Sequence, residues 1–406
     1  MDAETTERIK REIAYERGRT APPEGFPKLP DIPAGRYVDP DFFALEQERI
    51  WPRSWLMAGH RDELPGPGSY FRWDAAGVPL FLVRGRDEVI RAYYNTCSHR
   101  GGPVVREPSG QEITLRCGYH GWTYDLEGRL IGVPDERDFV DLDKSCRSLR
   151  SVRCECWGRF LFVCLDDEAP PLLDFLGSVP DETADFGMDE IRLVERQSHD
   201  LACNWKVAVD AFLETYHLEN LHPHSVARLI DHRGASMGLL PNGHSRMPTP
   251  VHEEHLAARA SGANPLDIRS VGEIARITNL AYSVFPNLIT PLEPGGFPIL
   301  LFWPRDVRTT TMEVLWFGGD WGEGEPPEQW PSLIRGFGTV LAEDTQFLPG
   351  IQRSMESPAF RGIPLSYQER RIYHQHEQID RVIGFARVPE ALRVEPLLAP
   401  YVEAGG

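Results

Sequence analysis

Histidines and carboxylates gather between Asn204 and Ser225, in the sequence NWKVAVDAFLETYHLENLHPHS. Apolar residues in its first half recur at three- and four-residue spacing, which predicts a helix with Asp210, Glu214 and His217 on one face. His222 lies five residues beyond His217, so the two rings converge only if the helix bends or ends, and the following proline favours such a stop. Two imidazoles near carboxylates indicate a metal site, with unrelated core or surface histidines as the alternative.

A second group of possible ligands has the pattern C-x-H-x17-C-x-x-H, formed by Cys97, His99, Cys117 and His120. Each Cys-His pair follows a strand-like run, so two loop tips can face each other. A structural zinc is one possibility, but zinc sites usually pair Cys with Cys and His with His. One Cys and one His from each glycine-rich loop instead indicate a Rieske [2Fe-2S] cluster, with two Cys on one iron and two His on the other.

The five remaining cysteines have the spacing of ordinary strand or core residues and suggest no second cluster; they are Cys146, Cys154, Cys156, Cys164 and Cys203. The 406 residues carry a net charge of −18, which argues against a nucleic-acid partner. No apolar run is long enough for a membrane span, and the N-terminus lacks an apolar signal core, so we expect a cytoplasmic protein without a membrane partner.

The chain divides into three predicted regions. Residues 1–54 begin with a polar, solvent-facing helix, followed by a proline-rich extended arm and a short helix from Asp41 to Ile50. Residues 55–165 contain short apolar runs separated by turn signals, which predict an all-β domain of hairpins. Residues 166–406 begin with an acidic, proline-bearing linker and contain the histidine-rich stretch.

The order of these motifs, a Rieske motif followed by NWK and then E-x-x-H-x4-H, resembles the alpha (catalytic) subunit of the Rieske non-haem iron oxygenases, the ring-hydroxylating family. The resemblance covers essentially the whole chain. It implies an α+β fold in which an N-terminal all-β Rieske domain precedes a catalytic domain whose antiparallel sheet is covered by helices (START-like, helix-grip). It also implies a mononuclear Fe(II) held by two histidines and one carboxylate, which here would be His217, His222 and a later acid.

We expect the third iron ligand to be Asp344. The segment from Ser332 to Ser354 predicts a helix, and Asp344 falls on its apolar stripe, where an unpaired carboxylate is costly. Glu343 points off that stripe, and Pro349 is expected to distort the helix beside Asp344. The alternative is a surface acid placed on the stripe by a misjudged register. The predicted stripe consists of Leu333, Phe337, Val340, Leu341, Phe347, Leu348 and Ile351.

The resemblance further implies a head-to-tail homotrimer, in which the Rieske cluster of one subunit lies next to the iron of its neighbour. A carboxylate three residues before the first histidine ligand bridges the two centres, so Glu214 would link His217 to His120 of the partner subunit. Asp210 is the rival bridge. Many ring-hydroxylating members have Asp at the position of Glu214, and Glu there is similar to oxygenases of quaternary amines such as carnitine. A beta subunit is also compatible with the family.

The substrate pocket is expected to involve Phe212, Leu213, the stretch 232–255, and two strands within 281–292 and 297–305. The sequence GLLPNGHSRMPTP within 232–255 suggests a flexible cover. Arg246 in that loop is expected at the surface, or paired with a substrate carboxylate.

The sequence thus predicts an oxygenase component that uses O2 and Rieske-derived electrons to hydroxylate an aromatic or related small organic substrate, by mono- or dioxygenation. N-demethylation of a quaternary amine or betaine-like compound is the alternative. No G-x-G-x-x-G fingerprint is present, so NAD(P)H and flavin are expected on a separate reductase, with or without a ferredoxin. A Rieske electron carrier would hold two irons per chain rather than three, and a non-catalytic ligand-binding module would tolerate His217→Ala.

Overall fold

The computed structural model describes residues 1–75, 77–260 and 264–403. The chain forms two compact units. One consists of Pro52–Leu172, and the other joins Met1–Trp51 to Leu173–Gly406. The N-terminal segment therefore belongs to the same unit as the histidine-rich stretch.

The unit Pro52–Leu172 is built from antiparallel strands, as the close spacing of short apolar runs predicts. Its larger sheet contains, in order across it, β2 (Leu56–His60), β11 (Phe160–Cys164), β10 (Ser151–Trp157), β5 (Ile90–Tyr94), β4 (Leu80–Arg84), β3 (Ser69–Trp73) and β6 (Ser109–Gln111). A smaller sheet contains β7 (Leu115–Arg116), β8 (Thr123–Tyr124) and β9 (Leu130–Gly132). The two cysteine-histidine loops follow β5 and β7, so the strand ends fix where the ligands emerge.

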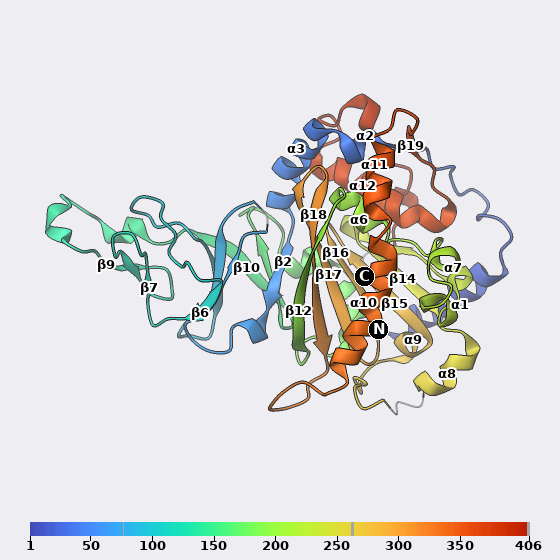
Figure 1. The fold of residues 1–406 in the computed structure, drawn as a ribbon, viewed down its shortest axis with the longest axis horizontal. Coiled ribbons are helices and arrows are strands. Elements are labelled where there is room, and N and C mark those ends of the chain that lie inside the picture. The colour runs from blue at the N-terminus through green and yellow to red at the C-terminus, as the bar shows by residue number, and fades with distance from the viewer. Residues whose placement is uncertain (76, 261–263, 404–406) are drawn as a thin grey trace. The chain divides into compact units, whose positions relative to one another are not determined.

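The other unit is organised around a seven-stranded antiparallel sheet (Figure 1). Its strands are, in order, β12 (Arg192–Leu201), β18 (Thr309–Gly318), β17 (Phe297–Asp306), β16 (Leu288–Leu292), β15 (Thr278–Val284), β14 (Ser245–Pro250) and β13 (Gly238–Leu239). The central strands β15, β16 and β17 are buried along most of their length. They form a floor on which the helices can pack.

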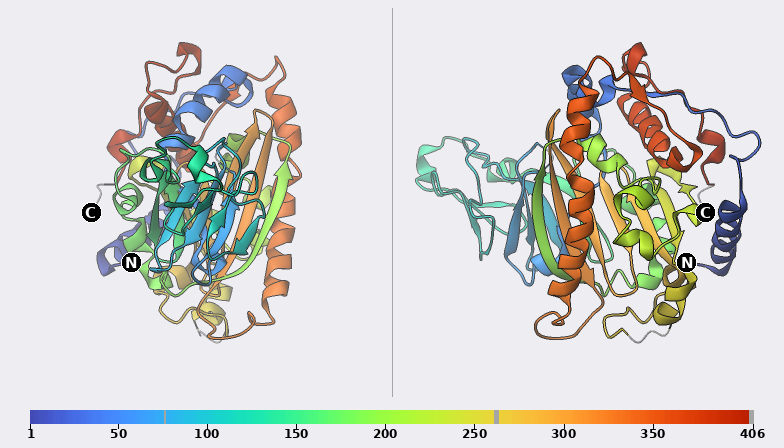
Figure 2. Two further views of the ribbon diagram at one scale, coloured as in Figure 1. Left: turned by 90° about the vertical axis from the view of Figure 1, so that its left-hand side faces the viewer. Right: turned by 45° about the vertical axis from the view of Figure 1, so that its right-hand side comes forward.

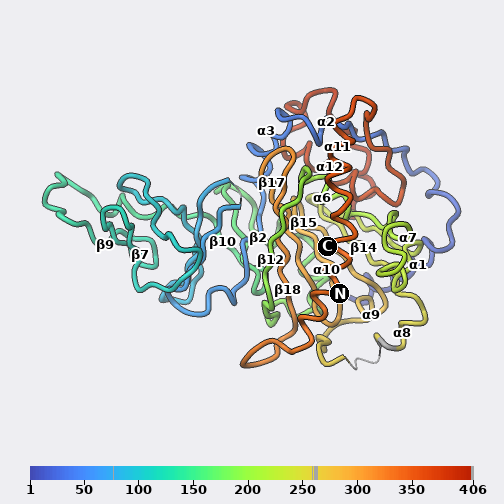
Figure 3. The backbone as a smooth tube through the Cα atoms, in the orientation of Figure 1, coloured from blue at the N-terminus to red at the C-terminus, as the bar shows by residue number. Residues whose placement is uncertain are grey.

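Helices cover this sheet, as expected for the α+β fold (Figure 2). The helices of the described residues are α1 (Ala3–Gly18), α2 (Gly35–Val38), α3 (Pro40–Arg49), α4 (Leu172–Leu176), α5 (Val179–Glu182), α6 (Trp205–Asp210), α7 (Leu218–Leu221), α8 (Glu253–Ala260), α9 (Glu273–Ile277), α10 (Trp330–Thr345), α11 (Leu348–Met355) and α12 (Arg370–Ile383). Helix α10 packs on β18, where Phe337 meets Trp316 at a ring-centroid distance of 5.1 Å. The N-terminal helices α2 and α3 lie beside α11 and α12 (Figure 3). A two-stranded sheet joins β1 (Ile32–Pro33) to β19 (Gly362–Ile363).

Three sequence expectations, about the N-terminal helix and two connecting segments, are wrong. Helix α1 is not simply solvent-facing, because it buries Ile9 and Ile13 against its own unit. The acidic segment that we expected to be a linker contains the short helices α4 and α5. The expected flexible cover, GLLPNGHSRMPTP, forms β13 and β14, and β14 is buried throughout because it pairs with β15 inside the sheet.

Arg246 in β14 is neither at the surface nor free for a substrate. It is 0% exposed and pairs with Glu182 at 2.6 Å and with Glu403 at 2.7 Å. A buried guanidinium requires such partners, and both come from segments distant in sequence. Within the described parts of the chain, every helix is too short or too polar to cross a membrane.

Candidate metal centres

The histidine-rich stretch is not one continuous helix. Asn204 caps α6 by accepting a hydrogen bond from the Lys206 amide, but α6 already ends at Asp210. The carboxylate of Glu214 then accepts from the amides of Tyr216 and His217, which offers the backbone an alternative to helical hydrogen bonds. A new short helix, α7, starts directly after His217. The prediction of a single helical face for Asp210, Glu214 and His217 is therefore wrong, although Glu214 and His217 do touch.

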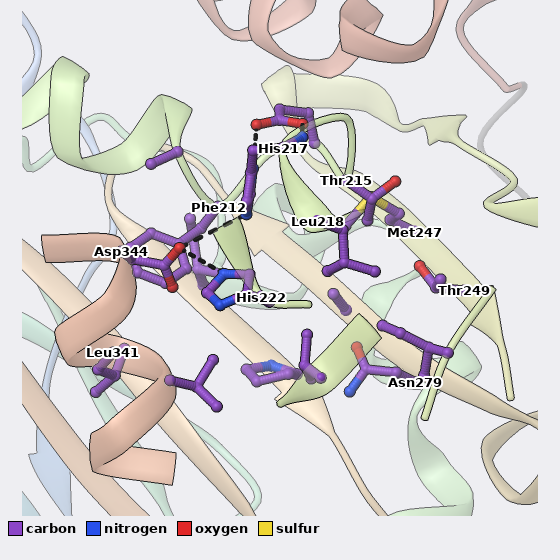
Figure 4. A pocket seen from close by; sticks show the side chains of 18 of the residues that line it. Phe212, Thr215, His217, Leu218, His222, Met247, Thr249, Asn279, Leu341 and Asp344 are labelled. Atoms are coloured by element: carbon purple, nitrogen blue, oxygen red, sulfur yellow. Dashed lines mark hydrogen bonds and ion pairs between the residues drawn. The ribbon is translucent and has the colours of Figure 1, made fainter. Parts of the chain in front are cut away.

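His217 and His222 flank α7, one before its first residue and the other after its last. Their rings lie 5.3 Å apart, and both face Asp344 on α10 (Figure 4). Asp344 Oδ1 is 2.9 Å from His222 Nε2 and 3.6 Å from His217 Nε2. One ligand atom from each of the three residues lies within 4.8 Å of the others, which is a spacing suited to a shared metal ion.

Each histidine is held by a carboxylate on its other nitrogen. His217 Nδ1 bonds to Glu214 Oε1, and His222 Nδ1 lies 2.7 Å from Glu343 Oε2. Glu343 also accepts from Ser225 Oγ at 2.6 Å. With Nδ1–H donated outward, the Nε2 lone pair of each ring is left for a metal, which is the usual arrangement around histidine ligands.

The local charges also act on the pKa values of the two histidines. Burial lowers the pKa of His217, but its hydrogen bond to Glu214 and the nearby carboxylate charges outweigh burial, so the pKa is raised. The same balance raises the pKa of His222, through its hydrogen bonds to Asp344 and Glu343. Anionic oxygens therefore surround both imidazoles, and a bound cation would replace the protons that these oxygens otherwise favour.

Asp344 lies on the buried face of α10 and is 6% exposed. Its ion-pair partners within the described residues are the two imidazoles, so no Lys or Arg there neutralises it. The helix breaks just beyond it, and Pro349 lies in the first turn of α11, close to where we expected a distortion. Asp344 therefore has the burial and the partners expected of a ligand.

The predicted apolar stripe is only partly correct. Leu333, Phe347 and Ile351 are 42%, 54% and 39% exposed. The buried face is instead formed by Ile334, Leu341, Asp344, Leu348, Gln352 and Met355. Within α10 the buried position is Ile334 rather than Leu333, and beyond Thr345 the break between α10 and α11 interrupts the helical period. Glu343 lies off the stripe, as expected, but its carboxylate contacts His222 Nδ1. In the sequence, the only indication of this role is its position next to Asp344.

Asp210 belongs to a separate buried network. Tyr37 Oη donates to Asp210 Oδ2 at 2.6 Å and lies 2.9 Å from His376 Nε2, and Arg36 Nε donates to His376 Nδ1 at 2.9 Å. Burial lowers the pKa of His376, although Asp210 opposes this. Asp210 thus joins the N-terminal segment to α12, and sequence reasoning missed Tyr37 and His376 because both lie far away in the chain.

Two cavities meet at the histidine cluster. The first has a volume of about 120 Å³, and its wall includes His217, His222 and Asp344. The second has a volume of about 210 Å³, and its wall includes His217 and Asp344 together with the exposed Phe347 and Ile351. The first extends among the strands β14 to β17 and is lined by Phe212, as expected, whereas Leu213 is not part of its wall. All three candidate ligands face the first cavity, so it is the better candidate for a substrate.

In the unit Pro52–Leu172, the two predicted cluster loops come together. His99 and His120 have ring centroids 4.5 Å apart, and His99 stacks on Trp122 at 4.9 Å. Cys97 and Cys117 are buried and not disulfide-bonded. His99 Nδ1 is buried without a hydrogen-bond partner among the described residues, as expected for a nitrogen reserved for a metal.

The surroundings of the two thiols also fit a cluster. A Cβ added to Gly102 would lie 3.3 Å from Cys117 Sγ, so the glycine allows the loop to approach the sulfur closely. Tyr124 Oη lies 3.2 Å from Cys97 Sγ. Burial raises the pKa of the Cys97 thiol, although the Tyr124 hydrogen bond acts against it, so the thiolate form requires a cation nearby. The donor set and this cradle fit a [2Fe-2S] cluster.

Comparisons with known proteins agree with both centres. Residues 54–152 match the family model of the Rieske [2Fe-2S] domain, and residues 188–384 match that of the ring hydroxylating alpha subunit (catalytic domain). The alpha subunit of 2-aminobenzenesulfonate 2,3-dioxygenase from Alcaligenes sp. is 34% identical over 336 residues, covering 76% of this chain and 80% of that protein. The glycine betaine monooxygenase oxygenase subunit of Chromohalobacter salexigens is 34% identical over 201 residues, covering 50% and 45% of the two chains.

Solved structures are similar at the level of the fold. The quaternary ammonium Rieske monooxygenase CntA, in complex with an inhibitor, matches with a TM-score of 0.76 at 22% identity, covering 89% of this chain and 99% of that chain. Naphthalene 1,2-dioxygenase with bound indole matches with a TM-score of 0.70 at 21% identity, covering 87% and 93%. The matched region spans about half the length of several curated relatives, such as 45% of the glycine betaine enzyme.

The chain belongs to the family of Rieske non-haem iron oxygenase alpha subunits, and the predicted family and fold class are confirmed. It carries a Rieske [2Fe-2S] domain followed by a ring-hydroxylating catalytic domain.

Proposed function

We propose that this chain is the oxygenase component of a Rieske oxygenase system and hydroxylates a small organic substrate with O2. The observation that carries the proposal is the cluster of His217, His222 and Asp344, whose ligand atoms lie within 4.8 Å of one another on the wall of a cavity. Two neutral nitrogens and one anionic oxygen on one side leave the opposite side open, which is the donor set of non-haem Fe(II) oxygenases. Cys97, His99, Cys117 and His120 would hold the Rieske cluster.

Bound to these residues, the two iron centres would supply O2 activation and the electrons that it consumes. The protein's own contribution is positional. Glu214 and Glu343 fix the tautomer and orientation of His217 and His222. Asp344 supplies a negative charge that is 6% exposed and is therefore little screened by water. Phe212 and the strand residues of the cavity exclude water from the place where a substrate would lie.

We further propose a head-to-tail homotrimer in which Glu214 links His217 to His120 of the partner subunit. The exposed surface near Glu214 supports an interface, because Tyr216, Phe347 and Ile351 are 63%, 54% and 39% exposed. His120 is itself exposed, and its neighbour Tyr119 is 61% exposed. Electrons would come from a separate reductase that binds NAD(P)H and flavin, or from a ferredoxin. A beta subunit and a cytoplasmic location remain predictions from the sequence.

For the substrate, an aromatic or related compound is the first candidate. The relative that matches over most of its length is named for a dioxygenase of 2-aminobenzenesulfonate. A quaternary amine is the second candidate, because Glu214 stands where the sequence resemblance to carnitine oxygenases places a glutamate, and one relative is named for glycine betaine.

Iron analysis together with oxygen uptake tests this proposal. The purified protein should contain three irons per chain, and the reduced protein with a surrogate reductase should take up oxygen in a substrate screen scored by product mass. His217→Ala should abolish product formation while leaving the visible spectrum of the Rieske cluster unchanged. Two irons per chain, or a His217→Ala variant with unchanged turnover, would contradict the proposal.

A further inference from the structure

The first cavity has two chemically different ends. The candidate iron ligands form one end (Figure 4). Thr215, Thr249 and Asn279 are drawn at the other side of the pocket from Asp344, with Leu218 between them. Thr249 and Asn279 are direct partners across β14 and β15, so the sheet register places both on the face that lines the cavity.

The two threonine hydroxyls at this end have unused hydrogen-bonding capacity. Thr215 is 4% exposed and Thr249 is 1% exposed, and neither Oγ1 atom has a hydrogen-bond partner among the described residues. Leaving a buried hydroxyl unpaired is unfavourable, so two such groups in one cavity indicate a place where a bound molecule is hydrogen-bonded. Asn279 is fixed beside them, because its Nδ2 donates to Glu293 Oε1 at 2.5 Å and Glu293 pairs with Arg259.

The remaining wall offers no free charge. The lining residues in the described part of the chain include no Lys or Arg, and the carboxylates are Glu214 and Asp344, both bonded to imidazoles. The aromatic residues are Phe212 and Phe337, and no Tyr or Trp belongs to this wall. With Asp344 engaged as a metal ligand and Glu214 bonded to His217, a charged ligand group would lose its hydration and gain no uncommitted counter-ion, which is costly. Quaternary ammonium groups are usually bound by a cage of several aromatic faces, and this wall offers two phenylalanines.

The size of the cavity limits the body of the ligand. Its volume of about 120 Å³ is comparable to the roughly 150 Å³ of an apolar protein cavity that holds benzene. The apolar residues between the two ends include Phe212, Leu218, Ile289, Leu300 and Leu341. This volume is close to that needed by a single six-membered ring.

We propose that the cavity selects a neutral, single-ring-sized substrate with one hydrogen-bonding substituent, and that Thr215 and Thr249 bind this substituent. The ring is thereby turned with its unsubstituted side toward His217, His222 and Asp344. This inference rests on the proposed function only in taking the end of the cavity at His217, His222 and Asp344 as the place where the substrate is hydroxylated. Thr215 and Thr249 are specificity-determining residues that lie outside the ligand set.

Equilibrium binding to the iron-loaded protein without electrons tests the inference independently of turnover. Phenol and toluene serve as probes of nearly equal size, of which only phenol carries a hydroxyl, and glycine betaine serves as the charged probe. Thr249→Val and Thr215→Val should each weaken phenol binding about two- to tenfold, the value of one neutral hydrogen bond, and leave toluene binding unchanged or tighter. Thr249→Ser, which keeps the hydroxyl, should retain phenol affinity. Glycine betaine should not compete with phenol.

A matched control comes from the same sheet. Thr290 is also buried, but its Oγ1 donates to the Pro298 carbonyl at 2.8 Å. Thr290→Val should lower the melting temperature and leave the ratio of phenol to toluene affinity unchanged. Thr249→Val should not lower the melting temperature of the ligand-free protein, because its hydroxyl has no partner to lose.

The inference is overturned if the ratio of phenol affinity to toluene affinity is the same in the wild type and in the double variant Thr215→Val/Thr249→Val. It is also overturned if glycine betaine displaces phenol. Oxygen uptake distinguishes this failure from a failure of the proposed function. If the protein consumes oxygen but its ratio of phenol affinity to toluene affinity does not depend on the two threonines, only the substrate inference is refuted. Threonine-dependent phenol binding in a protein that never consumes oxygen refutes only the proposed function.

Discussion

Removing the carboxylate of Glu343 is expected to weaken iron binding without disturbing the Rieske cluster. Glu343 Oε2 accepts hydrogen bonds from His222 Nδ1 at 2.7 Å and from Ser225 Oγ at 2.6 Å. Without Glu343, the His222 ring is free to turn and loses the negative charge that makes its Nε2 a stronger donor to a metal. Outer partners of histidine ligands typically contribute about 10- to 100-fold in metal affinity.

The position of Glu343 indicates the lower end of that range. Its side chain is 27% exposed, so water screens part of its charge. We expect Glu343→Ala to weaken Fe(II) affinity about tenfold, or roughly 1.4 kcal/mol. Glu343→Gln should have a smaller effect, because the amide oxygen can still accept from His222 Nδ1.

Anaerobic competition with a chromogenic chelator measures the Fe(II) affinity, and the visible spectrum reports the cluster. Glu219→Ala is the matched control, because Glu219 lies on α7 between the two histidines but is 57% exposed and faces His232 at 3.5 Å. Its affinity should stay within about twofold of the wild type, since an exposed pair of this kind contributes little. Wild-type affinity in Glu343→Ala, or equal losses in both variants, would refute the reasoning.

Three further predictions concern buried groups elsewhere. Glu46→Ala should destabilise the protein by about 3–5 kcal/mol in urea unfolding, because Lys206 Nζ, 2.7 Å from Glu46 and almost fully buried, would lose its counter-ion; an unchanged midpoint would contradict this. Burial lowers the pKa of His374 to about 4, so neutral His374 stabilises the folded protein above pH 6.5, and about 2 kcal/mol of this stability is lost at pH 5 as the pH falls toward 4. His374→Gln should therefore flatten the decline of the melting temperature between pH 7 and 5, and a decline identical to that of the wild type would count against this. Tyr124→Phe should lower the reduction potential of the cluster, because the hydrogen bond near Cys97 Sγ favours the more negative reduced state; spectroelectrochemical titration would show no shift if Tyr124 does not reach the cluster sulfur.

Local sequence patterns sufficed to predict which candidate ligands come together where those residues lie on one short segment. The loops that carry Cys97 with His99 and Cys117 with His120 are each a few residues long, and a few residues leave the side chains little choice of direction. The same holds for His217 and His222, which α7 alone keeps on one side. The all-β character of residues 55–165 was readable for a similar reason, because period-two runs and turn residues are local signals.

The helical period failed where a helix ended early. Asp210 was expected on the face of Glu214, but α6 stops at Asp210 and the chain turns. Phe347 was expected on a buried stripe and is exposed, since it lies between α10 and α11, which are separate helices. A capping side chain such as Glu214 competes with the helical pattern, and hydrophobic periodicity does not detect that competition.

By itself, the sequence determined the class of the protein and the two sets of candidate ligand pairs, because those depend on residue type and short spacing. Only the tertiary structure decided that Glu343 supports His222 from 121 positions away, and that Thr249 and Asn279 lie at the far end of the cavity. The contact of Glu343 depends on how α10 lies on the sheet, and the placement of Thr249 and Asn279 depends on the pairing of β14 with β15. Such long-range packing is set by the burial of many residues together, and no single motif records it.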